Sequence, residues 1–299
     1  MIAFLHLARI FGIVPFLRVK NHKLIVPKWT QWLSLLVQSI MVTMYIIYAF
    51  QHDQLVYLFN NIASKNAADE RLMFTSLTLT FNFLVDFCNI YLIVRNSQRN
   101  HKLANVLLKH FAAIDETLSG ASHSDILMTI FTATIYVARV AFIFSQFDKY
   151  TISFNVGVRF VYGMTFVTEQ WTSLMCMEIK SRYQKFHLML RQQTGDSTYK
   201  EVRALGALFE SLRDGHTHLV RHVSTFLLLD ISQLFMLVLN GILSVFLVCI
   251  MVPNEGDEQK SAGWCASNGM FAVDCLWRVG FLVHNCGALQ NEVRITMTQ

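Results

Sequence analysis

Charged residues interrupt the long apolar runs of this sequence, and seven of them are the first candidates for chemistry. A charged side chain at membrane depth costs about 2.5–3.5 kcal/mol on insertion scales, so each one needs a structural or functional reason. Arg159 and Asp230 lie close to the ends of their runs, which favours snorkelling or an internal ion pair. Asp274 and Arg278 are four residues apart on one helical face, so we expect them to pair. The seven residues are Asp86, Arg139, Arg159, Glu169, Asp230, Asp274 and Arg278.

Arg139 and Glu169 differ from the others because each lies deep in its run, with aromatic residues nearby in the sequence. When the runs are placed across a membrane as described below, both residues fall in the middle or outer part of the bundle. A small ligand from outside would bind there. Snorkelling or an internal ion pair is the competing explanation. The candidate ligand-binding residues are Arg139, Tyr136, Tyr162, Phe166, Glu169 and Trp171.

Enzymatic chemistry has little support in the sequence. Nucleophile-elbow, P-loop and dinucleotide-binding motifs are absent. His218 and His222 have the i, i+4 spacing that can hold a metal on a helix, but no Cys or carboxylate completes the set in an obvious way. The six cysteines show no C-x-x-C spacing, which indicates neither a zinc site nor a redox site. We therefore predict no enzyme activity, no catalytic or metal-binding residue and no cofactor.

The composition is typical of a membrane protein. Of the 299 residues, 54% are hydrophobic and 15% are charged, whereas soluble domains carry about 25% charged residues. The mean hydropathy is +0.39. These values exclude a disordered chain and a small disulfide-rich scaffold. The formal net charge of +5 does not indicate nucleic-acid binding, because the basic residues lie between apolar runs and form no patch.

Six apolar runs are candidates to cross a bilayer, which takes about 20 mostly apolar residues. The sixth run is the weakest, because Asp274 and Arg278 interrupt it. The sequence therefore predicts an all-α, polytopic membrane bundle that forms a single domain over residues 1–299. The predicted spans cover residues of about 33–50, 72–94, 126–147, 154–179, 226–252 and 271–289.

Lys and Arg residues are concentrated on one side of these spans. Of the 25 basic residues, 18 fall on the side of the N-terminus, 4 fall on the opposite side and 3 lie within spans. Basic residues are enriched in cytosolic loops. We therefore expect a multi-pass plasma-membrane protein with both the N-terminus and residue 299 in the cytosol.

Two cytosolic segments, 95–120 and 180–225, carry apolar stripes at helical spacing. Thr198 and Glu201 match a capping box, so the helix that enters the fifth span could run for about fifty residues, or about 75 Å. Helices lying on anionic lipid are one interpretation of the stripes. A packed cytosolic bundle is favoured, because the stripes continue directly out of spans without a turn signal.

The fifth predicted span carries polar residues on one face. The steps from Gln233 to Asn240 and to Ser244 are 7 and 4 residues, which is one helical stripe. Polar residues on a spanning helix usually face protein or water, so these three are the candidate pore-facing residues. Hydrogen bonds between helices would explain the same stripe.

With these features in place, the chain resembles the insect gustatory receptors, which belong to a chemosensory superfamily of seven-helix ligand-gated cation channels. Residues 9–16 (RIFGIVPF) look like the short segment that precedes the family's first helix. Residues 212–221 (LRDGHTHLVR) lead into 239–246 (LNGILSVF), which is similar to the family's fifth helix and its cytosolic approach. Residues 283–292 (VHNCGALQNE) look like the close of the sixth helix. The resemblance covers the whole chain.

The resemblance implies a taste-receptor subunit that gates cations when a small external tastant binds. It also implies a homo- or hetero-tetramer with related subunits, in which the fifth and seventh helices line the pore. An odorant receptor of the same superfamily is the sibling interpretation, and a membrane transporter or scaffold is the alternative from another class. The family's seventh helix carries Thr-Tyr, five mostly apolar residues and Gln-Phe, a signature that these 299 residues lack. We therefore expect this chain to be truncated and not to conduct by itself.

Overall fold

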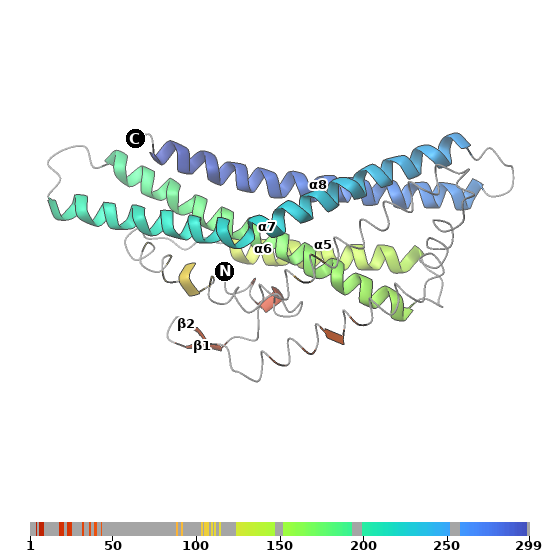
Figure 1. The fold of residues 1–299 in the computed structure, drawn as a ribbon, viewed down its shortest axis with the longest axis horizontal. Coiled ribbons are helices and arrows are strands. Elements are labelled where there is room, and N and C mark those ends of the chain that lie inside the picture. Colours follow the sequence, from red (N-terminus) through yellow and green to blue (C-terminus); the bar gives the residue numbers. More distant parts are fainter. Residues whose placement is uncertain are drawn as a thin grey trace.

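The described part of the chain is built from long helices (Figure 1). In the computed structural model they are α5 (Ser124–Gln146), α6 (Ile152–Gln192), α7 (Tyr199–Met251) and α8 (Glu258–Met297). Beyond these helices and one hairpin, the structure describes individual helical residues: Phe4, 6–8, Trp32, Leu36, 39–40, Thr43, Cys88, Tyr91, Leu103, 105–107, Lys109, Phe111 and Ile114. The predicted spans 33–50 and 72–94 therefore lie mostly outside the described residues.

The short hairpin is the one departure from helix among the described residues. Its strands β1 (Arg18–Lys20) and β2 (Lys23–Ile25) are antiparallel, and Arg18 lies opposite Ile25. Three residues a strand are too few to form a sheet with a core of its own. The prediction of an all-α architecture is therefore confirmed at this level.

The helices are longer than the apolar runs that predicted them. α7 has 53 residues and begins directly after the predicted N-cap Thr198, so the prediction of a helix of about fifty residues is confirmed. α8 has 40 residues and extends the predicted span 271–289 at both ends. Among the described residues, one helical segment, Arg203–Leu239, is long and apolar enough to cross a membrane, with a mean hydropathy of 1.7 in its most apolar part.

α6 and α8 run side by side in the same direction. Three contacts join them at nearly constant sequence separation: Glu169 with Arg278 at 109 residues, Cys176 with Cys286 at 110, and Gln184 with Glu292 at 108. A constant separation means that the two helices keep one register over this length. α7 follows α6 and precedes α8 in the sequence, and it runs in the opposite direction to both (Figure 1).

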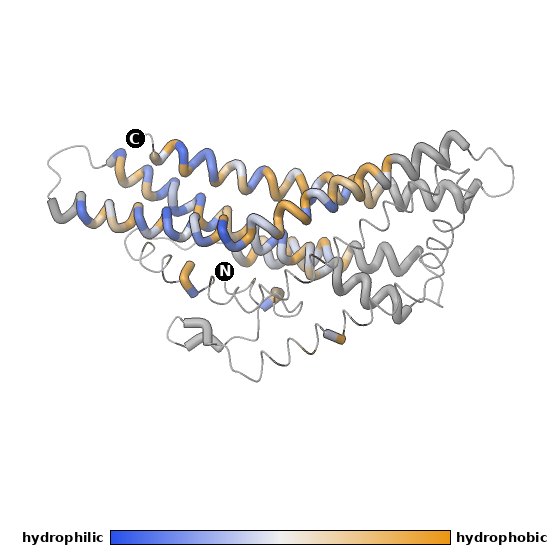
Figure 2. The backbone as a smooth tube through the Cα atoms, in the orientation of Figure 1, coloured by the Kyte–Doolittle hydropathy of each residue, from blue (hydrophilic) through white to orange (hydrophobic). Residues whose placement is uncertain are grey.

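Polarity changes along the bundle (Figure 2). Hydrophilic residues gather where α7 begins and α8 ends, and hydrophobic residues dominate α7 and α8 nearer the middle of the molecule. At 1.5 Å per residue, α6 and α8 are each about 60 Å long, twice the thickness of a bilayer's hydrocarbon core. Each helix is therefore long enough to have one segment in a membrane and another in water.

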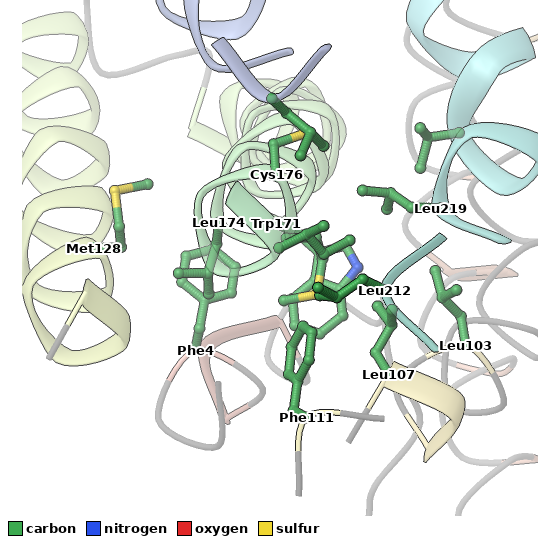
Figure 3. Packing of buried hydrophobic residues seen from close by; sticks show 14 of the residues in the cluster. Phe4, Leu103, Leu107, Phe111, Met128, Trp171, Leu174, Cys176, Leu212 and Leu219 are labelled. Carbon is green, nitrogen blue, oxygen red and sulfur yellow. The ribbon is translucent and has the colours of Figure 1, made fainter. Parts of the chain in front are cut away.

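The core surrounds α6. Every residue from 163 to 176 is buried, which makes α6 the central helix of the described structure. Residues of the predicted 95–120 stripe pack into the same core, among them Leu103, Leu107 and Phe111 (Figure 3). A second, smaller cluster joins α7 to α8 through Leu234, Val238 and Cys275.

Candidate functional site

A buried ion pair joins the centre of α6 to α8. Nε of Arg278 donates to Oε2 of Glu169 over 2.9 Å, and Nη2 of Arg278 donates to the other carboxylate oxygen. The side chains are only 1% and 2% exposed. Two parallel bonds between a guanidinium and a carboxylate fix the relative position of both groups. The pair therefore sets the register of α6 against α8.

The ring of Phe166 lies on the ion pair, one helical turn from Glu169. Its centroid is 5.9 Å from Cζ of Arg278, within the range of a cation–π interaction. The face of an aromatic ring stabilises a cation that has left water. Both the carboxylate and the ring thus stabilise the buried guanidinium.

An aromatic cluster joins α5 to α8 at Trp277, the residue before Arg278. Trp277 and Phe281 stack with ring centroids 5.4 Å apart, and Phe131 of α5 lies 5.7 Å from Trp277. The ion pair itself is almost fully buried, and in a dry environment an ion pair is electrostatically stronger. The site is therefore a buried ionic centre with the ring of Phe166 on it and an aromatic cluster beside it in the sequence of α8.

Buried polar groups flank Glu169 along α6. Thr168 and Thr172 donate to backbone carbonyls one turn earlier, at 2.7 and 2.9 Å, so these hydroxyls are satisfied within the helix. In the described part of the chain, four other buried atoms here make no hydrogen bond: Thr132 Oγ1, Gln170 Oε1, Trp171 Nε1 and Ser173 Oγ. A buried polar group without a partner is costly, so each needs a water molecule or a ligand to complete it.

Two of these groups lie on one face of α6. Gln170 and Ser173 are three residues apart, which places them on neighbouring turns. Thr132 comes from α5, which packs against α6. The available chemistry is hydroxyl groups that donate or accept and an amide oxygen that accepts. Such a set suits a small, uncharged molecule with hydroxyl or amide groups, because the charges present already neutralise each other.

The structure places four of the six predicted ligand-binding residues. Phe166, Glu169 and Trp171 are buried in α6, and Tyr136 of α5 packs against the core. Trp171 stacks on Phe4, with ring centroids 6.1 Å apart. The side chains of Arg139 and Tyr162 lie outside the described residues, although both residues belong to the helices α5 and α6.

The sequence analysis missed the role of Arg278. We expected a partner on the same helix, Asp274, and did not expect the bond between its guanidinium and Glu169, 109 residues away. Asp274 is half-buried and also takes part in an interaction. The prediction from i, i+4 spacing was incomplete, because it considered only partners on the same helix. Position within an apolar run was the signal that singled out both Glu169 and Arg278.

The polar stripe of α7 is described only in part. Gln233 is 7% exposed and lies inside the bundle, while the side chains of Asn240 and Ser244 lie outside the described residues. Asp230, one turn before Gln233, is 1% exposed, so it does not snorkel to water. Of the two explanations given for Asp230, an internal interaction is the one that the structure supports.

Among the described residues, no group of three His, Cys, Asp or Glu side chains lies close enough to hold a metal ion. His218 is exposed on α7 and His222 is half-buried. The site around Glu169 is therefore described without a metal.

No protein-family model matches the chain, and no curated protein is significantly similar to it.

Proposed function

We propose that the chain is a subunit of a chemosensory, ligand-gated cation channel of the insect gustatory-receptor type. It lies in the plasma membrane with a cytosolic N-terminus, crosses it six times and assembles as a tetramer with copies of itself or with related subunits. A small external tastant binds within the bundle and shifts it toward a conducting state. The lengths of α6, α7 and α8 support this proposal, since each helix is longer than a bilayer is thick, and α7 combines an apolar segment of membrane length with a polar extension.

The buried middle of α6 gives the strongest support for a ligand site. Residues 163–176 of the central helix α6 are all buried, yet this segment is polar, with a fixed ion pair and several atoms that find no hydrogen-bond partner among the described residues. A helix that served only for packing would be more stable with apolar residues at these positions. Polar groups inside a membrane bundle are by default candidates for a ligand or ion site.

Ligand stabilisation tests the proposed site. The chain in lipid nanodiscs would be heated with sucrose, fructose or caffeine, and unfolding midpoints would be compared. A ligand at about 100 times its Kd stabilises the folded state by about 2.7 kcal/mol, which raises the midpoint by several degrees. We expect at least one compound class to do this, and Gln170→Leu to abolish the effect because the amide acceptor is lost.

Gln290→Leu is the matched control, because Gln290 is exposed on α8 and the substitution is the same. The control should respond to the ligand as the native chain does. If ligand stabilisation survives Gln170→Leu and Ser173→Ala unchanged, the site around α6 is not where the ligand binds. If no compound stabilises the native chain, the proposed ligand classes are wrong.

A further inference from the structure

Two cysteines far apart in the sequence meet between α6 and α8. Sγ of Cys176 lies 3.8 Å from Sγ of Cys286, and both are free thiols. The sulfur atoms of a disulfide are about 2.05 Å apart, so these two are in contact and unbonded. Cys275, also on α8, is buried in the other hydrophobic cluster, on the side of α7.

The surrounding contacts hold the two thiols opposite each other. The Glu169–Arg278 pair fixes the register of α6 and α8 about two turns to one side of them. Nε2 of Gln184 donates to Oε2 of Glu292 over 3.3 Å, about two turns to the other side. The sulfur atoms therefore meet through the register of the helices, in van der Waals contact at 3.8 Å.

The two thiols differ in their access to an oxidant. Cys176 is buried within the core, whereas Cys286 is half-buried and packs against the edge of the core. A small oxidant such as hydrogen peroxide thus reaches Cys286 first. Thiol–disulfide chemistry proceeds by attack of one sulfur on an activated second sulfur, which the buried neighbour is placed to perform.

We propose that Cys176 and Cys286 are a redox modification site at which peroxide forms a reversible disulfide between α6 and α8. Cys286 thiol and hydrogen peroxide first give a sulfenic acid and one water. The sulfur of Cys176 then attacks the sulfenic sulfur, its proton leaves with the hydroxyl as a second water, and the S–S bond forms. The two thiols lose two electrons in total, and peroxide accepts them. A dithiol reductant restores both thiols by exchange.

The disulfide would lock the two parallel helices at their present register. The Glu169–Arg278 pair lies on the same interface, so oxidation would restrict movement of α6 against α8 at the proposed ligand site. The chemistry itself depends only on the contact between the thiols, and it does not require the proposed channel function.

Peptide mapping of the full chain in membranes tests the proposal. The membranes would be treated with hydrogen peroxide, quenched with catalase, alkylated and digested with trypsin without reductant. Cleavage after Lys and Arg puts Cys176 in peptide 160–180 and Cys286 in peptide 279–294, each with no other cysteine. We expect these two peptides to become linked, and the link to disappear after dithiothreitol.

Single variants complete the test. Cys286→Ser should abolish the linked peptide, whereas Cys275→Ser should leave it, because Cys275 lies against α7. Only the native chain is needed for the main measurement, so misfolding of a variant does not remove the test. Peroxide treatment that leaves both thiols open to alkylation, or that takes Cys286 to sulfinic acid without a link to Cys176, would overturn the proposal.

Discussion

At the residue scale, the most informative feature is the buried contact between Glu169 and Arg278. A carboxylate and a guanidinium that are almost fully buried stabilise each other only while both are present. Removing one charge leaves the other unpaired in a dry environment, whereas replacing both residues by apolar ones gives an apolar contact. This asymmetry separates a structural ion pair from two independent charges.

Glu169→Gln should therefore lower stability strongly. Breaking a buried pair by removal of one partner typically costs about 3–5 kcal/mol, so the unfolding midpoint of the detergent-solubilised protein should fall by several degrees. The double variant Glu169→Leu with Arg278→Leu should recover most of the loss. Glu210→Gln is the control, because Glu210 is exposed on α7. An unfolding midpoint for Glu169→Gln equal to that of the control would contradict the claim that the two buried charges stabilise each other.

Tyr183 gives a prediction outside the predicted spans. Its hydroxyl is buried and has no hydrogen-bond partner among the described residues, and burial raises the pKa of Tyr183 to about 12, with Arg213 opposing the shift. Because the folded-state pKa is above the unfolded value, the phenol stays protonated longer in the folded state. Its contribution to stability is complete below about pH 10 and is lost as the pH rises toward about 12.

Tyr183→Phe should consequently remove that part of the alkaline loss of stability. At pH 7 the variant should be as stable as the native protein or slightly more stable, because it deletes a buried hydroxyl that has no partner. Thermal unfolding between pH 7 and 12 measures both effects. A clear loss of stability at pH 7 would mean that the hydroxyl binds water or another group in the folded protein.

Sequence reasoning reached part of the site and could not reach the rest. Glu169 and its aromatic neighbours were found because a charge in an apolar run is conspicuous. The pairing with Arg278 was missed because Asp274 offered a nearer acid on the same helix, and contacts between helices leave no local pattern. The contact of Cys176 with Cys286 was missed for the same reason, since C-x-x-C spacing detects only local pairs.

At the element scale, the part of a helix that fits a bilayer and the full length of that helix are set by different features of the sequence. Hydropathy reports the segment that fits a bilayer, and caps and stripes report where the helix begins and ends. The start of α7 at Tyr199 was predictable from the capping box at Thr198 and Glu201. The full length of α8 was not, because its ends are polar and its middle carries two charges, so only residues 271–289 gave an apolar signal.

Substitutions at two glycines in the interior of α7 test how much intrinsic helix propensity contributes to the stability of this helix. A methyl group at Gly206 would meet no atom within 4 Å, and one at Gly215 would lie 3.5 Å from Cδ2 of Leu107, an ordinary contact distance. Glycine in a helix interior costs about 0.8–1.0 kcal/mol relative to alanine. Gly206→Ala and Gly215→Ala should therefore each raise the unfolding midpoint by a few degrees. A lower midpoint for Gly215→Ala alone would mean that α7 packs more closely on Leu107 than its Cβ can tolerate.

At the scale of the whole molecule, polarity divides the bundle along its long axis (Figure 2). The predicted topology puts 18 of the 25 basic residues on the cytosolic side. In that topology the parallel helices α6 and α8 begin on one side of the membrane, and antiparallel α7 begins on the other. The arrangement of the described helices is compatible with the predicted orientation, which comes from the basic residues.

Epitope tags test that orientation. A tag before Met1 should be inaccessible to antibody in unpermeabilised cells, and a tag between Met251 and Glu258, where α7 gives way to α8, should be accessible. Permeabilised cells are the control, since both tags should then stain. Surface staining of the N-terminal tag would show that the predicted topology is inverted.

Ligand-evoked current tests the central claim most directly. Whole-cell recordings would compare cells that express a related seven-helix receptor subunit alone with cells that also express this chain, with surface labelling to establish that the chain reaches the plasma membrane. The account predicts that co-expression adds a cation-selective current evoked by a small tastant, and that Gln170→Leu moves its dose–response to higher concentration while Gln290→Leu does not. Currents that are the same with and without the surface-expressed chain, for every tastant tested, would contradict the account.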